Sequence, residues 1–183
     1  MRIKPRRRLL LLVAAVLVVA TAVFALVFVR GWQRSRMLDQ AFSQARQALD
    51  QKHYFDALGA SANYLNRSSR SAAERATPRY ADALKIYAQS RYRVEESDQA
   101  HVRNASGKYR EYLEYRPDDL EVRRKLMELL NECGMYVEAI DLAPSARPKD
   151  LAAATAADVP VLRQEAMAYF KAHKFNDREP GAD

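Results

Sequence analysis

Hydrophobic and polar positions follow two different patterns along the chain. Residues 9–29 form a continuous apolar run without a charged residue, whereas after Met37 apolar residues recur three and four positions apart. A long uncharged apolar run is typical of a helix in a membrane, and the second spacing is typical of helices that bury one face. The sequence therefore predicts an all-α chain, in which a single N-terminal transmembrane helix precedes an array of antiparallel helical hairpins.

The apolar run 9–29 has the length of a membrane-spanning helix, about 31 Å against a hydrocarbon core of about 30 Å. Five basic residues precede it and three follow it: Arg2, Lys4, Arg6, Arg7 and Arg8, then Arg30, Arg34 and Arg36. Lysine and arginine favour the cytoplasmic side of a membrane. Residues 1–8 are therefore expected to be a basic cytoplasmic flank of a single-pass protein. The domain beyond the basic juxtamembrane segment 30–36 is expected to be exported across a bacterial plasma membrane.

A cleaved signal peptide is the alternative interpretation of the same segment. Ala20-Thr21-Ala22 has the small residues of a cleavage site. However, the apolar run continues to Val29, beyond the usual length of about 7–15 residues for the apolar part of a signal peptide. We therefore favour an uncleaved anchor. With no proline between residues 9 and 50, the helix can run on into the first helix of the array.

The segment after Met37 contains several amphipathic helices with recognisable ends. Helices are expected at 37–50, 54–66, 78–94, 98–115 and 120–133, and from Tyr136 onward. Asp119 is expected to cap the helix that follows it, and Gly134 to end that helix in a left-handed conformation. Thr77 is expected to cap the helix that begins at Pro78. Pro144 is expected to cut the last helix short.

The pattern weakens after Ala143. Residues 149–157 are rich in alanine and are predicted to be helical, and a further helix is predicted at 160–173. The aromatic residues of this last segment, which would need cover, are Tyr169, Phe170 and Phe175. Residues 144–176 are therefore assigned to additional helices that form a partial repeat, and 177–183 to a disordered tail.

Several helices share positions that indicate a repeat. Leu126, Gly134, Tyr136 and Ala139 mark one unit, and counting back 34 residues from Ala139 reaches Ala105, with Tyr109, Tyr112, Leu113 and Pro117 after it. Tyr54 lies three residues before Ala57, as Tyr136 does before Ala139. This pattern resembles the tetratricopeptide repeat (TPR), a helical hairpin of 34 residues. The resemblance covers residues 37–143.

The resemblance implies a binding module, because the first helices of successive repeats line a concave groove that holds a protein or peptide. The positions that it places in the groove are Arg46, Arg79, Asp82, Gln89, Glu121, Arg124, Glu128 and Asn131. A membrane-tethered scaffold or assembly factor is the function that follows. The alternative is a structural subunit of a larger envelope complex that docks through its C-terminal helix.

The charge distribution argues against nucleic acid as a partner. Eight of the 30 basic residues precede Met37 and all 23 acidic residues follow it. The part after the anchor therefore carries 22 basic against 23 acidic residues, and its net charge is −1 in place of the +7 of the whole chain. The basic anchor suits anionic lipid head groups, whereas a nucleic-acid-binding domain needs a basic face.

Residues for chemistry are sparse, and we expect no enzyme, no metal and no cofactor. The three histidines, His53, His101 and His173, are far apart and form no metal-binding spacing. Glycines are scattered, so no phosphate-binding loop is present. A single cysteine, Cys133, excludes an internal disulfide. An enzyme whose site is assembled from distant residues remains a third hypothesis.

Overall fold

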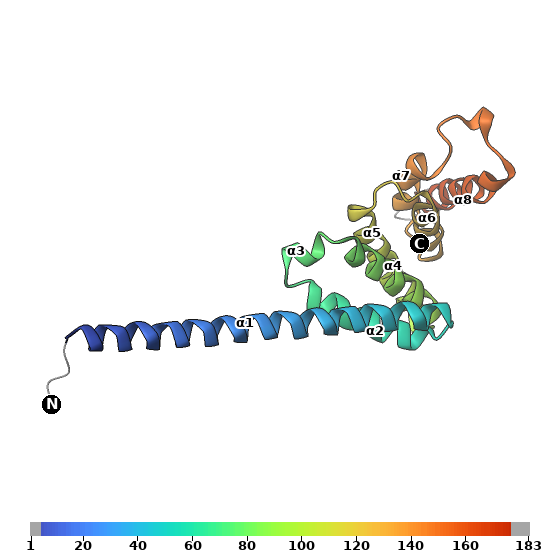
Figure 1. The fold of residues 1–183 in the computed structure, drawn as a ribbon. Helices are drawn as coiled ribbons and strands as arrows, with labels where there is room; N and C mark the ends of the chain where they lie inside the picture. Colours follow the sequence, from blue (N-terminus) through green and yellow to red (C-terminus); the bar gives the residue numbers. More distant parts are fainter. Residues whose placement is uncertain (1–4, 177–183) are drawn as a thin grey trace, which may run out of the picture. The chain divides into compact units, whose positions relative to one another are not determined.

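The computed structural model describes the backbone of residues 5–176 and the side chains of residues 17–19 and 21–173. Over this range the regular elements are all helical, without a strand (Figure 1). The α-helices are α1 (Pro5–Asp50), α2 (Tyr54–Ser68), α3 (Ala72–Arg75), α4 (Pro78–Arg93), α5 (Ala100–Tyr115), α6 (Leu120–Glu132), α7 (Tyr136–Ala146) and α8 (Val159–Asn176). Three short 3₁₀ turns are η1 (Ser97–Gln99), η2 (Leu151–Ala153) and η3 (Ala156–Asp158). The predicted tail 177–183 and residues 1–4 of the basic flank lie outside the described residues.

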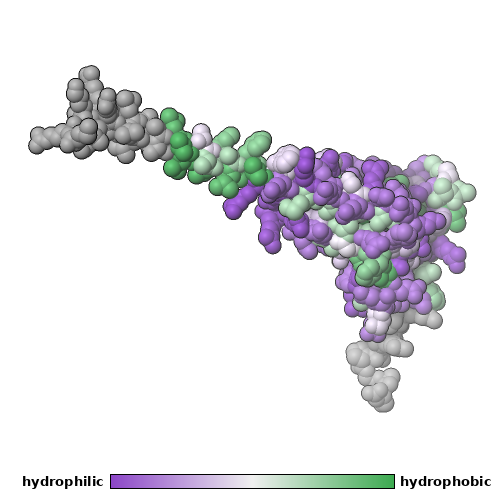
Figure 2. Space-filling view, turned by 60° about the horizontal axis from the view of Figure 1, so that its bottom comes forward, coloured by the Kyte–Doolittle hydropathy of each residue, from purple (hydrophilic) through white to green (hydrophobic). Residues whose placement is uncertain are grey.

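The chain divides into two compact units, Met1–Gln40 and Ala41–Asp183. In the first unit, α1 presents apolar side chains on all sides; Phe24 is 73% exposed and Phe28 66%. Figure 2 shows these hydrophobic residues gathered along the helix, in contrast with the mostly hydrophilic surface of the other unit. By length and composition, α1 is the one helix in the described part of the chain that could cross a membrane, a test that a signal sequence also passes.

The helix α1 continues without a break from the apolar run to Asp50. Gly31, the one residue of the run's C-terminal flank that could bend it, lies inside the helix, and a Cβ added there would meet no neighbouring atom within 4 Å. The expected continuity between the apolar helix and the first helix of the second unit is therefore confirmed.

In the second unit, each helix packs against its neighbours in the chain. Contacts join α2 to α4, α4 to α5, α5 to α6 and α6 to α7, and α8 packs on both α6 and α7. The three alanines that align along the sequence, Ala57, Ala105 and Ala139, are all fully buried. A methyl side chain lets neighbouring helix backbones approach closely, so these positions allow close packing of the helices.

The predicted ends of α6 are confirmed. A carboxylate oxygen of Asp119 accepts a hydrogen bond from the backbone N–H of Val122 at 3.1 Å, which satisfies one of the free donors of the first turn. Gly134 has a φ of +75°, the left-handed conformation that glycine adopts without a Cβ clash. Together these two residues set where the helix begins and ends.

Two expectations about helix ends are wrong. The side chain of Thr77 does not cap α4; its hydroxyl donates to the Glu74 carbonyl of α3 at 2.7 Å, which also accepts a bond from the Thr77 N–H. Pro144 does not end α7, which continues to Ala146. A proline so close to the C-terminus removes one hydrogen bond of the last turn, and the Arg147 N–H still bonds to the Ala143 carbonyl at 3.0 Å.

Residues 149–157 do not form the expected helix. They contain η2 and the start of η3, separated by extended backbone at Ala154 and Thr155. Asp150 accepts a hydrogen bond from the Ala152 N–H, and Asp158 accepts two from Thr155. Polar side chains that bond to nearby backbone N–H groups favour turns over a continuous helix, and here they outweigh the helix propensity of alanine.

Candidate binding groove

A hollow of about 580 Å³ opens on the surface of the second unit, between helices that are distant in sequence. We call it the groove. The end of α1 and the turn after it, the first residue of α2, the helices α4, α5, α6 and α8, and the short turn η3 all contribute to it. Its lining residues are Leu49, Asp50, Lys52, Tyr54, Lys85, Gln89, Tyr92, Arg93, Tyr109, Glu121, Val122, Arg124, Lys125, Glu128, Ala157, Pro160, Val161 and Gln164.

Some of the residues that the sequence predicted for a groove lie here and some do not. Those in the lining are Gln89, Glu121, Arg124 and Glu128. Arg46 and Arg79 are exposed and lie outside the lining. Asp82 lines a separate surface hollow of about 460 Å³, together with Tyr112 and Asp119. The structure therefore brings half of the predicted residues together.

Asn131 is buried beneath α8 and is not among the lining residues. Its amide nitrogen donates to both the backbone carbonyl and the side-chain oxygen of Gln164, each at 2.9 Å. The helix α8 also buries Val161 and Ala168, and Arg147 at the end of α7 binds its Glu165 at 2.7 Å. The helix thus folds back on α6 and α7 and forms one wall of the groove.

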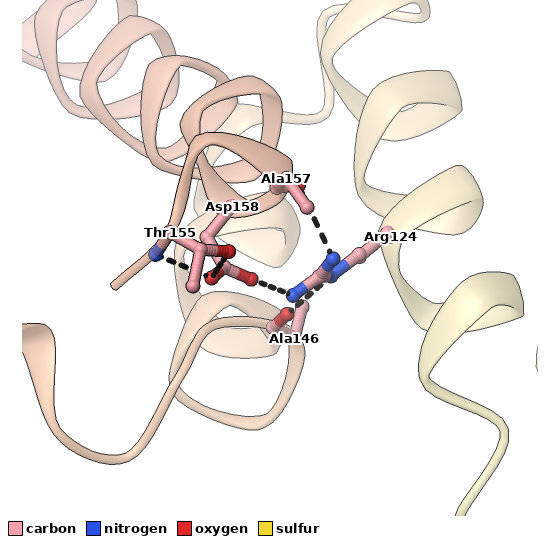
Figure 3. A network of polar contacts seen from close by, with 5 residues as sticks. All are labelled: Arg124, Ala146, Thr155, Ala157 and Asp158. Atoms are coloured by element: carbon pink, nitrogen blue, oxygen red, sulfur yellow. Dashed lines mark hydrogen bonds and ion pairs between the residues drawn. The ribbon is translucent and has the colours of Figure 1, made fainter. Parts of the chain in front are cut away.

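Arg124 lies in the lining and also joins three segments, as Figure 3 shows. Its Nε donates to the Ala146 carbonyl at 3.1 Å, and a guanidinium nitrogen donates to the Ala157 carbonyl at 3.4 Å. A third nitrogen pairs with the carboxylate of Asp158. Hydrogen bonds from the N–H and hydroxyl of Thr155, and then from Arg124, hold the pKa of Asp158 below its ordinary value. The charged form of Asp158 therefore ties α6 to the start of α8.

Two lysines of the groove have carboxylate partners. Lys85 lies 3.1 Å from Asp119 and 3.7 Å from Glu121, and Lys125 lies 2.8 Å from Glu128. Partial burial acts to raise the pKa of Asp119, but hydrogen bonds from the Tyr112 hydroxyl, the Val122 N–H and Lys85 outweigh it and lower the pKa. These pairs neutralise much of the charge along α6.

Tyrosine rings form part of the apolar lining of the groove. The guanidinium of Arg93 lies 6.0 Å from the centre of the Tyr54 ring and 5.8 Å from that of Tyr92. The Lys125 ammonium also contacts Tyr92, 4.2 Å from the ring centre. Cations over aromatic rings at such distances are attracted electrostatically to the ring faces. The exposed side chain of Arg93 therefore lies near the turn between α1 and α2.

Tyr109 is the most buried aromatic residue of the lining, at 3% exposure. Burial raises the pKa of its hydroxyl, and the carboxylates of Glu121 and Glu128 raise it further. The hydroxyl is therefore a proton donor at every physiological pH. It has no hydrogen-bond partner among the side chains and backbone that the structure describes, and it is not enclosed, so it opens into the groove.

Sequence reasoning missed several lining residues, and for some of them the sequence held a signal. Tyr92 and Arg93 follow Gln89 by three and four positions on α4, so continuing the helical spacing would have placed them on the same face. Lys52 had no such signal: it lies in the lining through a left-handed backbone, with a φ of +62°, that is uncommon for a residue with a side chain. Nothing local marks Gln164, because its place in the lining depends on how α8 folds back.

The groove combines several kinds of polar and aromatic group. Its side chains offer hydrogen-bond donors, paired charges and aromatic faces. No set of three histidine, cysteine, aspartate or glutamate side chains in the described part of the chain is arranged to hold a metal ion. Comparison with models of known protein families and with curated proteins finds no match for this chain.

Proposed function

We propose that this protein is a membrane-tethered protein-interaction module, a scaffold or assembly factor, whose TPR-like helical array binds a segment of a partner protein in the groove. The observation that carries the proposal is the groove itself. It is a hollow of about 580 Å³ lined by aromatic rings and polar groups from several successive parts of the array. Such a surface suits an extended or helical segment of another protein.

The packing of the second unit supports a repeat architecture. Helices contact their neighbours in chain order, and the aligned alanines Ala57, Ala105 and Ala139 are all buried. In repeat arrays, each unit buries its apolar face against the next, and the exposed concave side is left for binding. These features are what a TPR-like array requires.

The apolar part of α1 supports the membrane tether. A module held at a membrane has a raised effective concentration beside other membrane proteins, which strengthens binding without new contacts. On the balance of flanking basic residues, we place the N-terminus in the cytoplasm and the array on the exported side.

Site-specific photo-crosslinking of the full-length protein in its native membranes tests the proposal. A photoreactive amino acid replaces Gln89 in the groove, and Asn104 on the exposed side of α5 is the matched amide control. We expect a discrete crosslinked partner from position 89, absent from position 104 and lost when Arg93→Glu is added. Equal products from both positions, or none from position 89, would contradict groove binding.

A second candidate function rests on α8. Tyr169 and Phe170 of this helix are 54% and 59% exposed, which is unusual for two adjacent aromatic rings. They favour a structural subunit that docks onto a larger complex through its C-terminal helix. The side chain of Phe175, the third aromatic residue of this segment, lies outside the described residues.

A photoreactive amino acid at Tyr169 distinguishes the two functions. A partner captured there, and not at Gln89, would favour the structural subunit.

A further inference from the structure

The groove has unpaired positive charge at one end. Arg93 and Lys52 lie there, beside the turn between α1 and α2, and neither has a carboxylate partner among the described residues. The remaining cations of the lining are engaged: Lys85 and Lys125 with carboxylates along α6, and Arg124 with Asp158. Asp50 is the one acidic residue of the lining at this end, so the local charge remains positive.

The side chain of Arg93 is exposed and lies near two aromatic rings. Its guanidinium lies against the rings of both Tyr54 and Tyr92, at 6.0 and 5.8 Å from their centres. The planar fork of an arginine can bind both oxygens of a carboxylate. A ligand carboxylate at this end would therefore find a partner in Arg93.

The Tyr109 hydroxyl is a second group of the groove that is open to a ligand. Most of this side chain is buried, but its hydroxyl is not among the buried polar atoms of the described residues that lack a partner, so it reaches the open space of the groove. It has no hydrogen-bond acceptor among the described residues and can therefore donate to a ligand acceptor. Because Glu121 and Glu128 lie close enough to raise its pKa, the acceptor that fits is an uncharged one, such as a backbone carbonyl.

From these two features we propose that the groove binds an extended acidic segment of a partner protein. One carboxylate of the segment pairs with Arg93 and Lys52, and a backbone carbonyl accepts a hydrogen bond from the Tyr109 hydroxyl. This inference rests on the proposed function, since it names the chemistry of the partner.

Selection from a peptide library tests the proposal with the full-length protein in lipid nanodiscs. A randomised octapeptide library is displayed and selected on the loaded nanodiscs, and empty nanodiscs remove peptides that bind lipid. We expect the enriched peptides to contain more aspartate and glutamate than the unselected library. Their affinity, measured by fluorescence anisotropy, is expected to fall as the salt concentration rises.

Matched variants place the binding site. Arg93→Gln removes the charge and is expected to weaken an enriched peptide about tenfold or more, as the loss of a charged hydrogen bond does. Tyr109→Phe removes only the hydroxyl and is expected to weaken it about fivefold. The controls are Arg103→Gln on the exposed side of α5 and Tyr87→Phe on α4, which lie outside the lining and are expected to bind as the unchanged protein does. Circular dichroism verifies that each variant is folded.

The outcomes separate this inference from the proposed function. If enriched peptides are neutral or basic, groove binding stands and the acidic partner is wrong. If acidic peptides are enriched but Arg93→Gln binds them as Arg103→Gln does, they do not bind at this end of the groove and the inference is overturned. If no peptide is enriched over empty nanodiscs, both the inference and the proposed function fail.

Discussion

Two buried tyrosines of α5 show how the same side chain serves different roles. Tyr112 donates a hydrogen bond to the Asp119 carboxylate at 2.7 Å, and this bond holds the start of α6 against α5. Tyr109, three residues earlier, is equally buried, but its hydroxyl has no partner among the described residues. The hydroxyl of Tyr112 therefore stabilises the fold, whereas the hydroxyl of Tyr109 is available to a ligand.

The two tyrosines are expected to differ when each loses its hydroxyl. Tyr112→Phe leaves Asp119 without one of its donors and should lower the free energy of unfolding by about 1–2 kcal/mol. Tyr109→Phe removes an unpaired hydroxyl and should leave the stability unchanged or slightly increased. Thermal unfolding of the full chain in detergent micelles, followed by circular dichroism, compares them. A larger loss for Tyr109→Phe than for Tyr112→Phe would show that the Tyr109 hydroxyl has a structural partner.

Asp119 is expected to make the stability of the array depend on pH. Its pKa lies below the ordinary value of 3.8 in the folded protein. The stabilisation is therefore fully present above that ordinary value and is lost as the pH falls through the lower folded pKa. Asp119→Asn keeps a capping side chain but removes the charge. Urea unfolding between about pH 2 and pH 6 should show the two proteins converging in stability as the pH falls. A constant difference would mean that Asp119 titrates normally.

Among the helices, α8 is held mainly by side chains that reach it from other elements. Arg124 on α6 binds the Ala157 carbonyl and Asp158, Asn131 binds Gln164, and Arg147 binds Glu165. These polar contacts accompany a small apolar contact made by Val161 and Ala168. The wall that α8 adds to the groove thus depends on a few specific hydrogen bonds.

Loss of the Arg124 contacts should loosen α8 selectively. Arg124→Met keeps much of the side chain's apolar length but removes its hydrogen bonds to Ala146, Ala157 and Asp158. Hydrogen–deuterium exchange is expected to speed up in residues 156–173, with little change in α4 and α5. Arg163→Met, an exposed position on α8 itself, is the control and should leave exchange unchanged. Uniform acceleration across the whole array would indicate that Arg124 stabilises the fold globally.

At the scale of the whole molecule, the chain combines a helix with exposed apolar side chains and a helical unit with a mostly polar surface. The described valine, leucine and phenylalanine side chains of α1 are exposed, whereas the face of the second unit seen in Figure 2 is mostly hydrophilic. The topology that we propose puts a membrane around the first unit and water around the second. On this proposal, the flanking arginines and lysines decide the direction of insertion.

The proposed topology has a direct test in whole cells. A single cysteine is introduced by Glu114→Cys, an exposed position on α5, in a Cys133→Ser background that removes the native thiol. A membrane-impermeant thiol reagent should label this cysteine in intact cells whose outer barrier has been permeabilised. A cysteine placed in the basic flank by Arg6→Cys should be labelled only after lysis. The opposite labelling pattern would place the array in the cytoplasm.

Most of the helices could be predicted from the amino-acid sequence, because the signals that begin and end them are local. The apolar spacing of residues 120–130, the cap at Asp119 and the turn at Gly134 all act within a few residues, and α6 lies where they indicate. The prediction was wrong where two local signals competed, as in the alanine-rich residues 149–157 before α8. There, short-range bonds of Asp150 and Asp158 to the backbone replaced a helix by turns.

The contacts across the array, in contrast, follow from packing alone. Lys85 pairs with Asp119, and Asn131 with Gln164, over more than thirty positions of sequence. The packing of whole helix faces sets such contacts, and no pattern within either helix specifies them. For the same reason, the part of the groove lining on α4 and α6 follows from helical spacing, whereas the wall made by α8 and the unpaired Tyr109 hydroxyl became visible only once the helices were packed.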